Sequence, residues 1–275
     1  MKIQVSVEAA FYNKKSFFLS IGGKCSMLTD QLPRHFLCVL LLFIFACSLS
    51  NANTPLTITS GRGEPFVNIE HNGFYDLIVE NMFQRIGVEA KTILLPSERS
   101  LINANSGVDD GNIARIRGIE KKYKNLVMVP EKVIDFDFVA FTKNRQFEIE
   151  GWKSLKPYNV AFINGWKAFE KNVKHYKSLV RTRDSAQLFE LLNNDRVDVV
   201  LYDLWSGAWR NRQHSDNVDY LRPPVASYQL YLYINKKHKK LIPELSNALV
   251  SMKTDGTYQR IYEQTLNKLL KEHLY

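Results

Sequence analysis

Cysteine is scarce in this 275-residue sequence, and Cys25, Cys38 and Cys47 all lie near its N-terminus. The chain beyond Cys47 therefore forms no disulfide and offers no thiol as a nucleophile or a metal ligand. Because no disulfide can hold this part of the chain together, its stability must come from ordinary hydrophobic cores.

Motifs of the common enzyme classes are absent as well. The sequence has no Gly-x-Ser-x-Gly nucleophile motif, no phosphate-binding loop and no Gly-x-Gly-x-x-Gly. The histidines are scattered without the short spacings of zinc ligands. Besides His35 they are His71, His175, His214, His238 and His273. We therefore expect no metal, no cofactor and a protein that is not an enzyme.

The sequence has one long apolar run, Phe36–Leu49, and small residues follow it up to Ala52. This run is shorter than the about 20 residues that a membrane-spanning helix needs, and it is typical of a signal peptide cut after Ala52. We interpret residues 1–52 as an N-terminal extension and signal peptide, with Met27 as a candidate for the true start. We accordingly expect a periplasmic protein. An uncleaved membrane anchor and a lipid anchor on Cys47 are the alternatives.

The charge balance argues against a nucleic-acid partner. Five of the 37 Lys and Arg residues and two of the 28 Asp and Glu residues precede residue 53, which leaves a net charge near +6 for the rest. This is a mildly basic chain, and it has no stripe of Lys and Arg interleaved with aromatic residues.

Two stretches of the remaining chain resemble one another. Leu188–Asp203 (LFELLNNDRVDVVLYD) and Leu101–Ala114 (LINANSGVDDGNIA) each read as a helix, an Asn-containing turn and a Val-Asp pair that opens an extended segment. The repetition predicts two similarly built α/β lobes with a cleft between them. Chance similarity is the alternative.

Hydrophobic periodicity predicts alternating strands and helices along the chain. The predicted strands are Leu56–Thr59, Lys91–Leu95, a segment opened by Val108, Val133–Lys143, Tyr158–Ile163, Ser178–Arg181, Val197–Asp203, Asp219–Leu221 and Tyr228–Ile234. The predicted helices are Tyr75–Ile86, Ser100–Asn105 with Ser97 as its cap, one from Trp166, one capped by Asp184 or Ser185, Leu204–Asn211, Pro243–Met252 and Thr257–Leu270.

Two regions of the first half carry candidate ligand contacts. The loop after the first strand contains Arg62, Glu64 and Phe66, and such loops often bind ligands in α/β sheets. A plain turn with a buried Phe66 is the alternative. Arg99 lies in the first turn of a helix, where the helix dipole disfavours a cation. It is therefore either a ligand contact or a solvated surface arginine.

From Leu56 to Leu266 the sequence resembles the extracellular solute-binding proteins of family 3, the amino-acid-binding type. The resemblance is carried by GEPF at 63–66, the two helix-then-Val-Asp stretches, and the closing SMKTDGTYQRIYEQ at 251–264. It implies the two-lobed type II periplasmic-binding fold, in which each lobe is a mixed sheet flanked by helices and the ligand cleft lies between the lobes. It also implies the chain order: residues 53–143 for lobe 1, 144–227 for lobe 2, and 228–275 for the return strand to lobe 1 and the C-terminal helices.

The resemblance assigns roles to charged residues. In that family an Arg after the Val-Asp strand of lobe 1 binds the ligand carboxylate, and an Asp ending the matching strand of lobe 2 binds its ammonium group. Asp203, beside Tyr202, matches the second role, with helix capping as the alternative. The segment between Asp110 and Tyr123 is shorter than the family pattern, so two arginines are candidates for the first role. Arg115 is our first choice and Arg117 our second. A surface ion pair is the alternative for Arg115.

Aromatic and backbone groups complete the expected site. Phe66 and Trp166 would wall the ligand. The turn formed by Asn164, Gly165 and Trp166 would offer backbone N–H groups to an anion at a helix N-terminus.

By this resemblance the protein is expected to be a monomer that captures a small charged solute, an amino acid or a related compound, by hinge closure. The expected partner is the membrane permease of an ABC-type transporter. A ligand-sensing accessory to a membrane receptor is an alternative. A dehydratase-like enzyme of the same fold, using paired acids such as Glu64 and Asp203, is another.

Overall fold

The computed structural model describes residues 54–214 and 218–271. The apolar run at 36–49, Met27 and the three cysteines lie outside these residues, so the predicted signal peptide stays a prediction. Among the described residues, no helix combines the length and the apolar character needed to cross a membrane.

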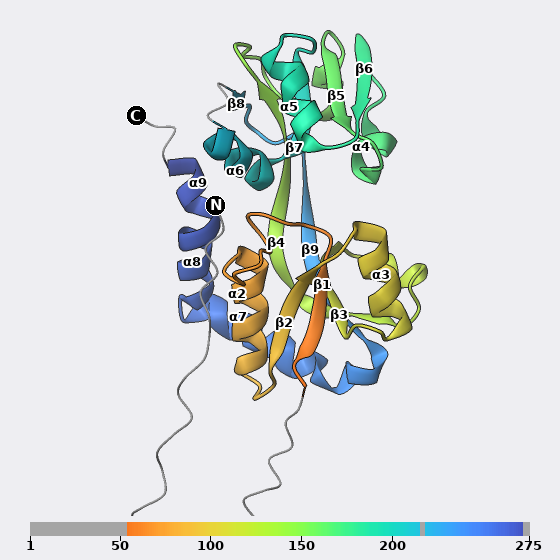
Figure 1. The fold of residues 1–275 in the computed structure, drawn as a ribbon, viewed down its shortest axis with the longest axis vertical. Helices are drawn as coiled ribbons and strands as arrows, with labels where there is room; N and C mark the ends of the chain where they lie inside the picture. Colours follow the sequence, from red (N-terminus) through yellow and green to blue (C-terminus); the bar gives the residue numbers. More distant parts are fainter. Residues whose placement is uncertain (1–53, 215–217, 272–275) are drawn as a thin grey trace, which may run out of the picture. The chain divides into compact units, whose positions relative to one another are not determined.

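The described strands form one mixed sheet in the order β2-β1-β3-β9-β4-β7-β5-β6, with β8 paired to β4 (Figure 1). Their bounds are β1 Leu56–Ser60, β2 Ala90–Leu94, β3 Gly111–Ile116, β4 Leu126–Thr142, β5 Asn159–Ile163, β6 Ser178–Thr182, β7 Val199–Asp203, β8 Asp219–Tyr220 and β9 Ala226–Asn235.

The helices of the described chain alternate with these strands. They are α2 Phe74–Gln84, α3 Ser97–Ser106, η1 Ile119–Lys121, η2 Gly151–Leu155, α4 Lys167–Asn172, α5 Ser185–Asn193, α6 Leu204–His214, η3 Lys236–Leu241, α7 Ile242–Thr254, α8 Thr257–Tyr262, the π-helical η4 Glu263–Asn267, and α9 Lys268–Lys271. The predicted single helix Thr257–Leu270 thus contains a π-helical turn.

Two long strands connect the halves of the sheet. β4 and β9 run antiparallel from the pair Leu126–Asn235 to the pair Phe138–Ala226. One half contains β1, β2 and β3 with helices α2, α3 and α7, and the other contains β5, β6 and β7 with α4, α5 and α6 (Figure 1). This arrangement is the predicted two-lobed α/β fold, in which each lobe contains one half of the mixed sheet and its flanking helices.

Helix α2 illustrates how the sequence sets these elements. Its buried residues include Phe74, Ile78 and Met82, which lie four apart on one face of the helix. Before it, the N–H of Gly73 donates to Asp76 Oδ2 at 3.0 Å, which caps the first turn. In the other half, Asp184 caps α5 by accepting from Gln187 N at 2.9 Å, as one of the two predicted caps.

The two similar stretches make the same contacts in both halves. Asp110 Oδ2 accepts from Thr57 N at 2.8 Å, and Asp110 N donates to Thr57 O at 2.8 Å. Asp198 Oδ2 likewise accepts from Asn159 N at 2.8 Å, and Asp198 N donates to Asn159 O at 2.9 Å. Each aspartate therefore joins the turn after a helix to the start of a parallel strand.

By these contacts Asp110, and not Asp109, is the equivalent of Asp198. The predicted match between the two Val-Asp pairs is therefore wrong by one residue. Asp109 instead accepts from Asn103 Nδ2 at 2.9 Å. β3 begins at Gly111, later than the predicted Val108, which is an exposed residue. A Cβ on Gly111 would lie 2.7 Å from Tyr233 O, so only glycine allows β9 to approach at the start of β3.

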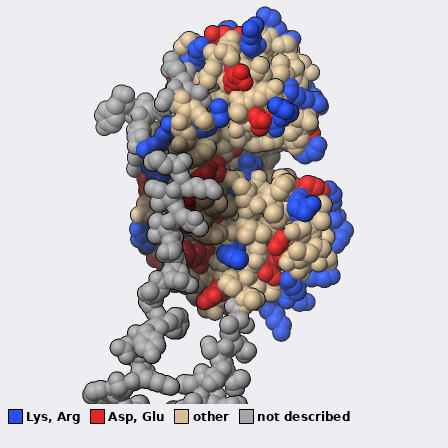
Figure 2. Space-filling view, viewed as in Figure 1, with Lys and Arg blue, Asp and Glu red and all other residues tan. Residues whose placement is uncertain are grey.

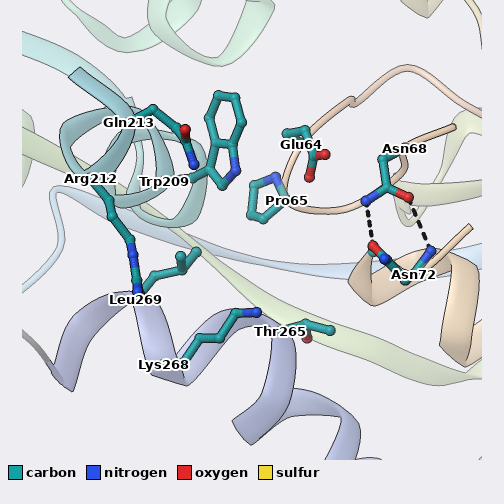
Figure 3. A pocket seen from close by; sticks show the side chains of 11 residues that line it. Glu64, Pro65, Asn68, Asn72, Trp209, Arg212, Gln213, Thr265, Lys268 and Leu269 are labelled. Carbon is teal, nitrogen blue, oxygen red and sulfur yellow. Dashed lines mark hydrogen bonds between the residues drawn. The ribbon is translucent and has the colours of Figure 1, made fainter. Parts of the chain in front are cut away.

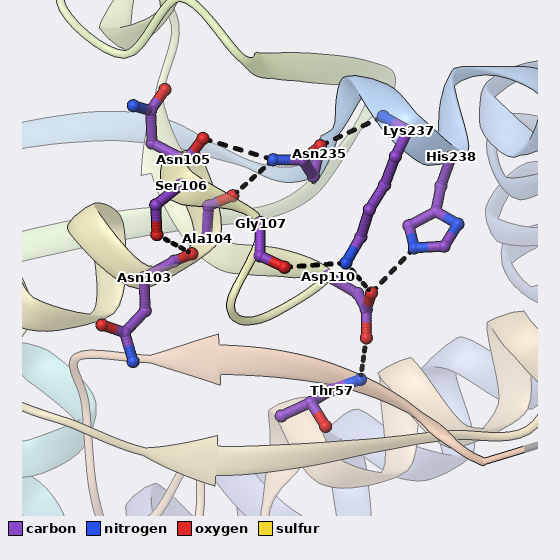
Figure 4. Close-up of polar contacts among 10 residues, drawn as sticks. All are labelled: Thr57, Asn103, Ala104, Asn105, Ser106, Gly107, Asp110, Asn235, Lys237 and His238. Carbon is purple, nitrogen blue, oxygen red and sulfur yellow. Dashed lines mark hydrogen bonds and ion pairs between the residues drawn. The ribbon is translucent and has the colours of Figure 1, made fainter.

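Asp110 has further partners on the return segment of the chain (Figure 4). Its Oδ1 lies 2.7 Å from Lys237 Nζ and 2.7 Å from His238 Nε2. Burial raises the pKa of Asp110, but the hydrogen bonds from Lys237, Thr57 and His238 outweigh it, and the pKa lies below its ordinary value. The stabilisation is therefore present above the unfolded pKa of about 3.9 and is lost as the pH falls through the folded pKa.

Asp110→Ala and Asp198→Ala should each lower the free energy of unfolding by about 1–3 kcal/mol, because each leaves a strand N–H without its acceptor. Urea denaturation at neutral pH measures this loss. The matched control is Asp135→Ala, which removes an exposed pair with Lys132 and should cost at most about 1 kcal/mol. A variant at either position that is as stable as the control would contradict the structural role of the shared contact.

Candidate functional site

Asp203 ends β7 and begins the turn into α6. Its Oδ1 accepts from Ser206 N at 2.8 Å, so the carboxylate caps this helix. The side chain is fully buried. Burial raises the pKa of Asp203, and the nearby charge of Arg62 and the N–H groups of Ser206 and Trp205 offset this only in part. A buried carboxylate of this kind needs a cationic partner.

That partner is Arg62, which comes from the other half of the chain. Arg62 Nη1 lies 3.5 Å from Asp203 Oδ2. The Arg62 backbone N–H donates to Ser60 Oγ at 3.0 Å, which fixes the loop after β1. The contact joins the loop of one half to the strand end of the other. On the face drawn in Figure 2, the surface is hollowed between these two halves.

Aromatic rings surround the Arg62 guanidinium. Its Cζ lies 4.1 Å from the centre of the Phe136 ring and 5.3 Å from that of Trp166. Trp166 in turn stacks on Tyr202, with ring centres 4.9 Å apart. Burial, followed by the charge of Asp203, raises the pKa of Tyr202 to about 12. These rings reduce the access of water to the ion pair and so strengthen it.

Tyr75 is a site residue that the sequence analysis missed. Its side chain is buried and stacks on Phe66, with ring centres 4.6 Å apart. Its hydroxyl has no hydrogen-bond partner among the described residues. Burial raises its pKa, and the charges of Arg62, Asp203 and Arg115 all act on it. A polar atom in this position is suited to meet a ligand or a water molecule.

Arg115 leaves the end of β3 and reaches the first turn of α3. Its guanidinium donates to Ser97 Oγ at 2.8 Å, to Ser97 O at 3.0 Å, to Ser100 Oγ at 2.7 Å and to Asn112 Oδ1. Only one N–H of Nη1 is left without a partner in the described chain. Burial and the charge of Arg62 lower the pKa of Arg115 to about 10.

Two backbone features aim Arg115 at α3. Ala114 has φ of 66°, and the pairing of β3 with β9 shifts register between Asn112 and Arg115. Such a bulge redirects the side chain that follows it. The predicted role of Ser97 as the helix cap is wrong, because the cap residue is Pro96 and no side chain caps α3. The Ser97 hydroxyl instead accepts from Arg115.

The other predicted residues lie elsewhere or have different partners. Arg117 is exposed and bonds to Tyr231 Oη at 3.3 Å. Arg99 is also exposed, and it makes no hydrogen bond or ion pair within the described residues. Phe66 is fully buried and stacks on Tyr75, so its predicted place in the wall of the site stays a prediction.

The turn before α4 does not present free N–H groups. Gly165 N donates to Glu170 Oε1 at 2.9 Å, and Asn164 N donates to Thr182 O at 2.8 Å. Trp166 N donates to Ile163 O at 3.3 Å. These backbone donors all have protein acceptors, so of this turn only the Trp166 ring contributes to the surroundings of Arg62.

Glu64 belongs to a different region, a pocket of about 240 Å³ (Figure 3). The lining residues come from the loop before α2, from α6 and from the last helices: Glu64, Pro65, Asn68, Asn72, Gly73, Trp209, Arg212, Gln213, Thr265, Lys268 and Leu269. Asp203 is not among them, so the paired acids of the dehydratase alternative do not share this pocket. Within the described ranges, no cluster of three or more potential ligands could hold a metal.

No protein-family model matches the chain. A protein of Shewanella oneidensis, described only as uncharacterized, is 24% identical over 250 residues, which are 85% of this chain and 94% of that protein.

Solved structures share the fold over 78% of this chain. They include the ligand-binding core of GluR0 with L-glutamate, with a TM-score of 0.66, 12% identity and 99% of that chain covered. The substrate-binding protein of an amino acid ABC transporter gives a TM-score of 0.59 at 18% identity, with 99% covered. A histidine kinase sensor domain similar to periplasmic binding proteins gives 0.62 at 16% identity, with 96% covered. The chain therefore has the two-lobed fold of the amino-acid-binding periplasmic proteins, as the sequence resemblance implies.

Asp203→Asn should change the pH dependence of stability. Because the pKa of Asp203 is raised on folding, the folded protein keeps a proton that the unfolded chain loses above about pH 3.9. The parent therefore loses stability as the pH rises through the folded pKa, and the variant does not. We expect the stability of the variant relative to the parent to be greater at pH 7 than at pH 4, as measured by urea denaturation.

The Arg62→Ala background is the control for this experiment. It removes the cation that lowers the pKa of Asp203, so the change between pH 4 and pH 7 caused by Asp203→Asn should become larger. A relative stability that does not vary with pH in either background would contradict a raised pKa for Asp203.

Tyr75→Phe should raise the free energy of unfolding of the ligand-free protein by about 1 kcal/mol, because it removes a buried hydroxyl without a partner. Tyr233→Phe is the matched control and should be destabilising by a similar amount, since the Tyr233 hydroxyl bonds to Ile116 O, Glu120 Oε2 and Gly118 N. Equal destabilisation by both variants in urea would show that the Tyr75 hydroxyl has a partner.

Proposed function

We propose that this protein is a periplasmic solute-binding protein. It captures a small charged solute, an amino acid or a related compound, in the cleft between its lobes, and delivers it to the permease of an ABC-type transporter. We take residues 53–143 and 228–275 as lobe 1 and residues 144–227 as lobe 2, and the protein as a monomer. The observation that carries the proposal is the contact of Arg62 with the buried Asp203, because it sets charged groups of both lobes against one another.

Hinge closure is the mechanism that this geometry supports. The long strands β4 and β9 continue from one lobe into the other, so bending near the pair Phe138–Ala226 would move the lobes apart. In the open form the ligand meets the charged groups of one lobe only. In the closed form it meets both sets, and it shifts the population toward closure by its greater affinity for that form.

A sensory role is the second candidate. It is favoured by the fold shared with a histidine kinase sensor domain that is itself similar to periplasmic binding proteins. In that case the closed lobes would contact a membrane receptor instead of a permease. We do not propose catalysis, since Glu64 lines a pocket without Asp203 and the fold matches described above are to binding and sensor proteins.

A thermal-shift screen against amino acids, polyamines, small carboxylates and sugars tests the function. A true ligand should raise Tm in proportion to the logarithm of its excess, and it should reduce the radius of gyration in small-angle scattering. By calorimetry, Asp203→Ala should weaken binding by about 1.5–3 kcal/mol. The control Arg183→Ala changes an exposed arginine with no side-chain bond in the described chain and should bind like the parent.

Failure of every solute class to stabilise the protein would count against the binding function. Turnover of a bound solute would favour the enzyme alternative instead. Loss of solute uptake in cells that lack the protein would support the transporter over the receptor.

A further inference from the structure

We propose that the site takes a small organic carboxylate and that the ligand needs no ammonium group. Arg62, Tyr75 and the remaining N–H of Arg115 would bind the carboxylate, and Asp203 would act by holding Arg62 in place. This inference rests on the proposed solute-binding function and names the chemical class of its ligand.

The first argument is that Asp203 already has its cation. Its Oδ1 accepts from Ser206 N, and its Oδ2 lies beside Arg62 Nη1. A ligand ammonium that approached Asp203 would have to displace a guanidinium that also lies over the Phe136 and Trp166 rings. The arginine therefore occupies the position at the carboxylate that an ammonium group would need.

The second argument is a surplus of donors. Arg62 Nε and Nη2 have no hydrogen-bond acceptor in the described part of the chain, whereas Nη1 faces Asp203. The buried Tyr75 hydroxyl lacks a partner there too. Arg115 keeps one N–H, and its remaining donors hold α3 in place. A carboxylate, which accepts in two directions at once, fits these donors and an ammonium group does not.

The third argument is the charge balance. The site contains two guanidinium groups, those of Arg62 and Arg115, and one buried acid, Asp203, which is paired with Arg62. Positive charge is therefore in excess. The two guanidinium groups are close enough for the charge of Arg62 to lower the pKa of Arg115. One ligand carboxylate would neutralise this excess, whereas a ligand cation would add to it.

Matched pairs of probes that differ only in the ammonium group test the inference on the purified protein. The pairs are acetate and glycine, propionate and L-alanine, succinate and L-aspartate, and glutarate and L-glutamate, with 1,4-diaminobutane as a cation. Thermal shift identifies the binders, and calorimetry gives their dissociation constants. In the pair that binds, we expect the carboxylate to bind more tightly than its amino acid, or at most about threefold more weakly, and we expect no binding of 1,4-diaminobutane.

Two variants then locate the bound carboxylate. Arg62→Ala should weaken its binding by about 10- to 100-fold, as expected for a lost charge-assisted hydrogen bond. Tyr75→Phe should weaken it by about 3- to 10-fold without destabilising the ligand-free protein, so that a folding defect cannot explain the loss. Arg183→Ala is the control and should bind the same carboxylate like the parent.

Each contrary result has a distinct meaning. An amino acid that binds more than about tenfold tighter than its carboxylate partner overturns this inference and still supports solute binding. Binding of 1,4-diaminobutane, or of a sugar from the thermal-shift screen, without binding of any carboxylate also overturns this inference and still supports solute binding. Binding of a carboxylate that is unaffected by both variants places the anion elsewhere and overturns the assignment. No shift with any probe counts against the binding function itself.

Discussion

The buried carboxylate of Asp203 is the constraint on which the site depends. Removing an ion from water costs several kcal/mol even after the protein relaxes, and a lobe that buried this charge alone would be destabilised. The structure offsets the cost from two directions. Ser206 donates a backbone N–H from the helix that follows, and Arg62 supplies a cation from the other half of the chain. The guanidinium of Arg62 can therefore compensate the carboxylate of Asp203 only when the two halves lie close together.

The aromatic surroundings follow from the same constraint. A guanidinium is weakly hydrated and stacks on ring faces, so Phe136 and Trp166 can exclude water from Arg62 at little cost to its charge. Phe136 lies on β4, one of the strands that connect the halves, and Trp166 lies at the start of α4 in the second half. The ion pair is thus flanked by residues whose relative positions would change if the connecting strands bent.

The sequence predicted the fold well because its elements are strongly periodic or clearly terminated. Gly256, with φ of 82°, separates α7 from α8 between the two predicted helices Pro243–Met252 and Thr257–Leu270. Predictions that depended on tertiary contacts were less accurate. The Ser97 hydroxyl was expected to cap α3, but it accepts from Arg115, which is distant in the sequence. Local rules cannot anticipate a competing donor of that kind.

The sequence predicted some residues of the candidate site and missed others. Asp203 and Trp166 follow strand ends, where an α/β fold gathers its ligands, and both lie at the Arg62 contact. The loop position of Arg62 marked it as a candidate, but its partner could only be known from the folded chain. Tyr75 went unnoticed because helical spacing marks it as a core residue, and nothing in that spacing tells whether its hydroxyl has a partner.

The one-residue correction of the internal repeat explains why the two halves carry opposite charges. Once Asp110 is matched to Asp198, the fifth residue after each is Arg115 in the first half and Asp203 in the second. Equivalent positions at the ends of equivalent strands thus hold a cation and an anion. Arg62 satisfies the anion, and Arg115 is bonded only to neutral oxygens. A negative charge is therefore what the site lacks, and a ligand carboxylate would supply it at the junction of the two halves.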